Sequence, residues 1–167
     1  MIFKVNVSDI YECSLERAFK TGILCDITKV HTGYGFTPKV THTTKDEAWG
    51  QPGSSKKVFV AKSITQGGGF AFMDRIIERK ENAYWKLQVD EFQSWTAGFH
   101  KFVGEWKTTS LEDGNVLVEY SYALYASSPL LYPINWAFAN LFWKKYMKRV
   151  LENIKVMAYE EEPYLYQ

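Results

Sequence analysis

The apolar and polar positions near the C-terminus predict one long helix whose two halves differ. From Trp143 to Ala158, apolar residues recur every three or four positions, with lysine, arginine and glutamate between them. This is the pattern of a helix with one buried stripe and one hydrated face. From Pro129 to Phe142 the chain is apolar on almost every side. We expect a helix over about 133–158, with a first half that meets apolar surroundings all round through core packing, a cavity mouth or a peripheral membrane contact.

Upstream of this helix the pattern predicts strands and short helices. Residues 2–7 alternate between apolar and polar, which indicates a strand. Ser14 can cap a short helix, and a second short helical segment covers about 22–30. About six strands follow, separated by turn signals such as Asp113-Gly114. Strands joined by hairpins form an antiparallel sheet, so the long helix should lie on one face of it.

Three segments carry a resemblance to a known family. They are a Pro-Gly turn and strand (GQPGSSKKVFV, 50–60), a glycine turn with two strands (GGGFAFMDRIIERKENAYWKLQV, 67–89) and a hairpin (GEWKTTSLEDGNVLVEYSYAL, 104–124). In this order the chain resembles the START/birch-pollen-allergen superfamily (SRPBCC), and most of all its polyketide-cyclase/dehydrase and lipid-transport branch. The resemblance implies an α+β helix-grip fold, in which a curved seven-stranded antiparallel sheet with two short helices wraps around the long C-terminal helix and encloses a cavity. We expect one domain over 1–167, with a frayed acidic tail at 160–167.

Composition narrows the classes of function. The aromatic fraction is 17%, which suits a bulky core or a cavity lined with flat side chains. A net charge of +1 gives no electrostatic footprint for nucleic acid. Cys13 and Cys25 form no disulfide scaffold, the N-terminus lacks the pattern of a signal peptide, and no window reaches the roughly 18 apolar residues of a membrane span. A cytoplasmic location is predicted.

We expect neither a metal nor a cofactor. His31 and His42 are too far apart in sequence for a local metal motif, and neither cysteine has a cysteine near it. The segment QGGGF lacks the Lys-Ser/Thr of a phosphate loop and precedes a strand instead of a helix.

The LEDG segment sets the expected faces of the last hairpin. A two-residue turn at Asp113-Gly114 would place Thr108 opposite Glu119, and side chains opposite each other share a face. Alternating lysine and glutamate mark the other face as hydrated, although a register shift of one residue would reverse the assignment. The face predicted to be inside carries His100, Phe102, Gly104, Trp106, Leu117, Glu119, Ser121, Ala123 and Tyr125.

Three polar side chains are candidates for functional groups in the cavity: His100, Glu119 and Asp74. They could fix the polar group of a ligand, or they could perform acid/base chemistry, as the cavity residues of cyclases and dehydratases in the resembled superfamily do. Alternatively, the two carboxylates lie near strand ends and reach water. The candidate ligand-contacting residues are Trp85, His100, Phe102, Trp106, Glu119, Tyr125, Trp136 and Phe142.

The leading hypothesis is a module that binds a hydrophobic, lipid-like or aromatic small molecule. The first alternative is a cyclase or dehydratase. The second is a peripheral membrane or protein-interaction role for the segment 129–143, since aromatic residues followed by basic ones are typical of an interfacial helix.

Overall fold

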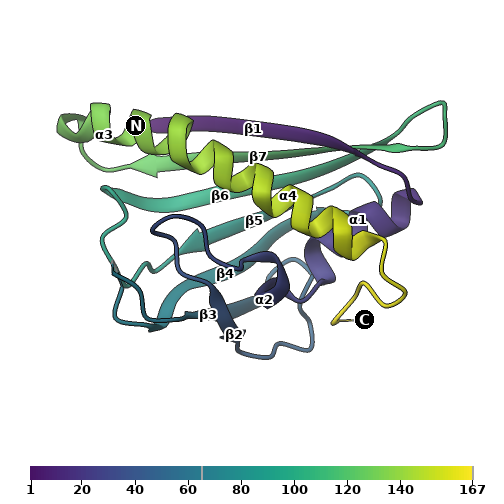
Figure 1. The fold of residues 1–167 in the computed structure, drawn as a ribbon, viewed down its shortest axis with the longest axis horizontal. Helices are drawn as coiled ribbons and strands as arrows, with labels where there is room; N and C mark the ends of the chain where they lie inside the picture. Colours follow the sequence, from purple (N-terminus) through teal and green to yellow (C-terminus); the bar gives the residue numbers. More distant parts are fainter. Residues whose placement is uncertain (65, 167) are drawn as a thin grey trace.

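The fold is a single curved sheet that wraps around a long C-terminal helix (Figure 1). The computed structural model describes residues 1–64 and 66–166. Its antiparallel sheet has seven strands in the order β1-β7-β6-β5-β4-β3-β2. In chain order the strands are β1 (Ile2–Tyr11), β2 (Val40–Thr43), β3 (Ser55–Val60), β4 (Gly69–Lys80), β5 (Tyr84–Asp90), β6 (Phe99–Ser110) and β7 (Val116–Ala126).

Two short helices separate β1 from β2. They are α1 (Leu15–Leu24) and α2 (Ile27–Val30). The predicted cap is confirmed, because the Ser14 hydroxyl accepts a hydrogen bond from the Arg17 amide at 3.2 Å. Such a bond satisfies one of the amides that the first turn of a helix leaves unpaired.

The C-terminal helix follows β7 and crosses the concave face of the sheet (Figure 1). Its consecutive parts are η1 (Pro129–Leu131), α3 (Tyr132–Ala137), the π-helix η2 (Phe138–Trp143) and α4 (Lys144–Ala158). The long helix expected over about 133–158 is therefore confirmed. The buried stripe of α4 consists of Tyr146, Met147, Val150, Leu151, Ile154, Met157 and Ala158.

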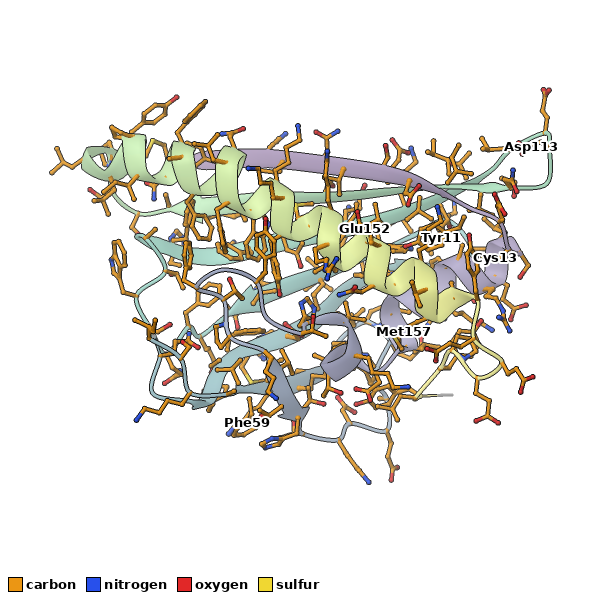
Figure 2. The ribbon with its side chains drawn as sticks, viewed as in Figure 1. Tyr11, Cys13, Phe59, Asp113, Glu152 and Met157 are labelled. Carbon is orange, nitrogen blue, oxygen red and sulfur yellow. The ribbon has the colours of Figure 1, made fainter. Side chains whose placement is uncertain are left out.

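The register of the last hairpin differs from the expected one by a single residue. Ser110 pairs with Val116 across a five-residue loop, in which the Leu111 amide donates to the Asn115 carbonyl at 2.8 Å. Asp113 lies at the tip of this loop, far from α3 (Figures 1 and 2). Because side chains alternate along a strand, this shift places the even-numbered residues of β7 inside and the odd-numbered ones outside.

The acidic tail is held against the body of the protein, contrary to the fraying that we predicted. The amides of Leu165 and Tyr166 both donate to the Leu24 carbonyl, at 2.8 and 3.2 Å. The Tyr166 ring lies 6.4 Å from that of Trp49. These backbone bonds tie the end of the described chain to α1, the helix that closes one end of the sheet.

Candidate functional site: a cavity between the sheet and the helix

A cavity of about 830 Å³ lies between the concave face of the sheet and the helices. Its wall is formed by inward side chains of β2 to β7, by α1 and α2, by the loops over 36–38 and 91–98 and by the C-terminal helix. Most of the lining side chains are aliphatic or aromatic. The volume falls within the roughly 300–1,000 Å³ that is typical of small-molecule sites.

Large rings fill the end of this space that faces α1. Trp106 is fully buried, stacks on Trp85 with ring centroids 5.8 Å apart, and donates from Nε1 to the Ala18 carbonyl at 3.2 Å. Gly22 of α1 accommodates the indole, since a Cβ at this position would lie 2.7 Å from the Trp106 ring. The indole therefore occupies space that would otherwise extend the cavity toward α1.

A second glycine positions a tyrosine in the wall. Tyr122 of β7 lies across Gly104 of β6, where a Cβ would come within 2.7 Å of the phenol ring. The Tyr120 hydroxyl donates to that of Tyr122 at 3.0 Å. The His31 Nδ1 and the Tyr146 hydroxyl, which lie 2.6 Å apart, contribute a second polar pair to the wall.

Asp74 of β4 contributes a carboxyl to the same wall. The residue is 7% exposed, and Oδ1 has no hydrogen-bond partner in the described part of the chain. Burial raises the pKa of Asp74 to about 7, although the charge of Lys56 opposes this shift and that of Asp90 adds to it. A carboxyl with such a pKa exchanges its proton near neutral pH, so it can either donate or accept a hydrogen bond.

Lys56 of β3 is paired with Asp74 in the sheet and faces inward, yet it is not among the described residues that line the cavity. The side chain is almost completely buried, and Nζ lies 3.7 Å from the centroid of the Trp49 ring. Burial lowers the pKa of Lys56 to about 8, with Asp74 opposing the shift. Nζ makes no hydrogen bond to any described residue, so the indole face is its main partner.

The cavity opens where the C-terminal helix meets two loops. Phe36, Trp95 and Leu141 line the cavity and are also exposed, by 51%, 73% and 57%. Phe36 stacks on Phe142 of η2 with ring centroids 3.9 Å apart. The π-helix η2 thus forms part of the mouth, and wide helical turns of this kind occur frequently at functional sites.

The predicted site residues divide between the wall, the core and the outer surface. Trp85, Phe102, Phe142 and Asp74 line the cavity, and their part in ligand binding remains a prediction. Trp106 is packed in the core and is not among the described lining residues. The expected catalytic group of His100, Glu119 and Asp74 is not assembled, since only Asp74 faces the cavity.

The other predicted residues lie outside the cavity. Glu119 faces outward because of the register shift, and its Oε2 lies 3.2 Å from the Lys107 Nζ. The same shift turns Tyr125 outward, under the Lys101 ammonium group. His100 is exposed at an irregularity in the β6–β7 ladder, where its Nδ1 lies 2.9 Å from the Ser127 Oγ.

Trp136 was also predicted to contact the ligand, and this prediction is wrong. It is 46% exposed, and it lies on the side of α3 away from the described lining residues. An apolar pattern on all sides of a helix does not say which side faces the cavity, because the usual polar face is missing.

Sequence reasoning missed two polar groups of the wall and the inward lysine beside it. Tyr120 and Tyr122 were assigned to the hydrated face, although Val118 and Leu124 flank them in the same alternation. The set of even-numbered residues of this strand is more apolar than the set that contains Glu119. This difference could have identified the inward face from the sequence. Lys56 likewise alternates with two valines of β3 and could have been recognised as inward.

Comparisons with known proteins bear on the fold. No family model matches the chain, and no curated protein does. The crystal structure of Ara h 8.0201 has a TM-score of 0.68 at 13% identity and covers 95% of this chain and 98% of its own. A point mutant of norcoclaurine synthase from Thalictrum flavum, in complex with a transition-state analogue, has a TM-score of 0.68 at 10% identity, over 95% of this chain and 94% of its own. A Staphylococcus aureus protein of unknown function has a TM-score of 0.66 at 11% identity, over 96% and 98%.

The chain has the helix-grip fold. This confirms the architecture that the sequence resemblance implied. At 10–13% identity the likeness concerns the fold alone, and helix-grip proteins differ in what they do, so the function has to be argued from the cavity. Within 1–64 and 66–166, no helix is long and apolar enough to cross a membrane.

Proposed function

We propose that this protein binds a hydrophobic small molecule in the cavity between its sheet and its C-terminal helix. The observation that carries the proposal is an apolar space of about 830 Å³ with an open mouth. Burial of ligand surface contributes roughly 25 cal/mol per Å², part of which is offset by the loss of ligand freedom. A largely preformed site keeps the cost of ordering the protein low.

A cyclase or dehydratase activity has less support. That alternative invoked the imidazole of His100 and the carboxylate of Glu119, whereas both residues are on the outside. The wall does hold one imidazole and one carboxyl, those of His31 and Asp74, but burial lowers the pKa of His31 to about 4, so this ring is a weak base near neutral pH. Asp74 can supply an acid or a base, but without the two partners, His100 and Glu119, that the alternative invoked. Binding without turnover is therefore the function that we propose.

Filling the cavity tests the proposal. Val89→Phe adds bulk at a buried lining position of β5, whereas Val103→Phe adds the same bulk to the outer face of β6. We expect the neutral dye Nile red to bind the wild type at one site, with its fluorescence as the readout. Val89→Phe should weaken this binding by about tenfold or more, because it removes ligand space and contacts. Circular dichroism and thermal melting of both variants control for folding.

The outcome against the proposal is equally definite. Equal dye affinity in Val89→Phe and Val103→Phe would place the dye outside the cavity, and a wild type that binds no dye would contradict the proposed function.

Contact with a membrane is a second candidate, favoured by the surface around the mouth. Leu130, which is 90% exposed, and Trp136 add to the exposed apolar residues of the opening. Lys144, Lys145 and Lys148 follow on the next turns and are exposed, and none of them forms an ion pair with a described residue. Apolar residues beside basic ones suit the surface of an anionic bilayer. Co-sedimentation with lipid vesicles tests this candidate.

A further inference from the structure

The wall of the cavity carries an unbalanced set of charged groups. Among the described lining residues, Asp74 is the only aspartate, glutamate, lysine or arginine. The other polar lining groups are hydroxyls, an imidazole, a thiol, an amide and the indole N–H groups of four tryptophans, of which Trp85 Nε1 and Trp143 Nε1 have no hydrogen-bond partner in the described chain. A ligand in this space therefore meets one carboxyl group and no cationic side chain.

The cation that interacts electrostatically with Asp74 is Lys56. The Lys56 ammonium group is on the face of Trp49, with almost no exposed surface, and is not part of the described lining. It moderates the charge of Asp74 without offering a ligand a direct ion pair. The titratable groups that interact electrostatically with Asp74 from the neighbouring strands and from α4 are Lys56, Asp90, Tyr120, Tyr122 and Tyr146.

The unpaired hydrogen-bonding groups of the wall also restrict the polar group that a ligand can carry. Asp74 Oδ1 is buried without a partner in the described chain, and an unpaired buried acceptor is unfavourable. The Tyr122 hydroxyl accepts from Tyr120 and keeps its own proton to donate. A ligand hydroxyl can donate to the carboxylate and accept from a tyrosine, so it serves both needs.

We propose that Asp74 selects the polar group of the ligand, so that the cavity takes up neutral apolar molecules bearing a hydroxyl group and rejects carboxylates of the same chain length. This inference rests on the proposed function and specifies its ligand class. A carboxylate would be held near a like charge, with no lining cation to neutralise either group. An alkylammonium ion would reach Asp74 but would place a second positive charge near Lys56.

Displacement of Nile red by decanol, decanoate and decylamine tests the selection on the full chain. At about pH 8, one unit above the pKa of Asp74, we expect decanol to displace the dye from the wild type at a concentration about tenfold or more below that of decanoate. Asp74→Asn should bring the two concentrations within about threefold of each other, because the amide carries no charge. Asp9→Asn removes a carboxyl that pairs with Lys155 of α4 and is not among the described lining residues, so it is expected to leave the selection unchanged.

The pH dependence separates charge from shape. Between about pH 6 and about pH 8, the preference for decanol over decanoate should rise more steeply in the wild type than in Asp74→Asn, since only the wild type gains a charge at this position. A merely structural role of Asp74 would give equal slopes.

Three results would overturn the inference: equal displacement by decanol and decanoate, a selection that persists in Asp74→Asn, or tighter binding of decylamine than of decanol. In each of these the dye still binds and is displaced, so the proposed function stands. If Nile red does not bind, or no chain displaces it, the proposed function itself fails and the inference fails with it.

Discussion

Asp74 and His31, which both line the cavity, make the stability of the folded protein depend on pH in opposite directions. Burial raises the pKa of Asp74 from 3.8 to about 7, so the folded chain keeps a proton that the unfolded chain loses. The stability that this group contributes is complete below about pH 4 and is lost as the pH rises through about 7. Burial lowers the pKa of His31 from 6.5 to about 4, so its contribution is complete above about pH 6.5 and is lost as the pH falls through about 4.

Between about pH 4 and about pH 6.5 the two effects oppose each other. We therefore expect acid to lower the free energy of unfolding of Asp74→Asn through His31, because this variant lacks the opposing contribution of Asp74. From about pH 4 to about pH 8, the free energy of unfolding of the wild type should fall relative to that of Asp74→Asn by on the order of 4 kcal/mol, which corresponds to a shift of about three pKa units. Urea unfolding at several pH values measures this difference.

Asp9→Asn is the control for the loss of a carboxyl group as such, because Asp9 lies outside the described cavity lining, beside the Lys155 ammonium group. Parallel pH profiles of the wild type and Asp74→Asn would show that the carboxyl is hydrated in the folded protein.

At the scale of elements, periodicity predicted the helices and the number of strands, but it did not predict the register of the β6–β7 hairpin. The stripe of α4 repeats over four turns, so one misassigned residue does not change the conclusion. The β6–β7 register depends on the length of one loop, and Asp113-Gly114 suits both a two-residue turn and the observed five-residue loop. One residue of difference turned Glu119 outward and brought Tyr120 and Tyr122 into the cavity wall.

Asp74 and Phe102 line the cavity as expected, although Met73 and Ile77 blur the alternation around Asp74. Phe102 keeps its predicted face despite the changed register, because the lysines and glutamate on the opposite side of β6 mark that side as hydrated whatever the length of the loop. Lys56 was missed because a lysine is rarely buried, so its own alternation was given no weight. Contacts such as that of Lys56 with Trp49 join residues that are distant in the sequence, and no local sequence pattern predicts them.

Two glycines set how closely the elements approach one another. Gly22→Ala would bring a Cβ to 2.7 Å from Trp106, and Gly104→Ala would bring one to 2.7 Å from Tyr122. We expect each to lower the free energy of unfolding by about 1–3 kcal/mol, since a large ring must move. In α1 this cost exceeds the roughly 1 kcal/mol that alanine adds through helix propensity. Urea unfolding measures both variants.

Gly67→Ala is the matched control, because nothing lies within 4 Å of the Cβ that it would add and its φ is not in the left-handed region. Its stability should stay within about 0.5 kcal/mol of the wild type. Wild-type stability in Gly22→Ala and Gly104→Ala would mean that the rings move aside freely.

At the scale of the whole molecule, the two ends of the cavity have opposite characters. Trp106, α1 and the tail close one end, and the β6–β7 hairpin extends beyond it (Figure 1). The mouth at the other end is surrounded by exposed apolar side chains from η1, α3 and η2. The first half of the C-terminal helix is therefore apolar all round because one side lines the cavity while the other faces outward at the mouth.

If this outward side contacts a membrane, its loss should reduce vesicle binding without changing the cavity. The double variant Leu130→Ser/Trp136→Ser removes two exposed side chains that are not among the described lining residues. We expect the wild type to co-sediment with vesicles that contain phosphatidylserine, and the double variant to bind about tenfold or more weakly, since each buried apolar side chain contributes roughly 1.5–3 kcal/mol.

Val156→Ser, at a 65% exposed position of α4 toward the closed end, should bind like the wild type. Added salt, or vesicles of phosphatidylcholine alone, should weaken binding through Lys144, Lys145 and Lys148. Equal sedimentation of the wild type and the double variant, with unchanged Nile red affinity in both, would assign these exposed residues no role at a membrane and leave the cavity as the functional site.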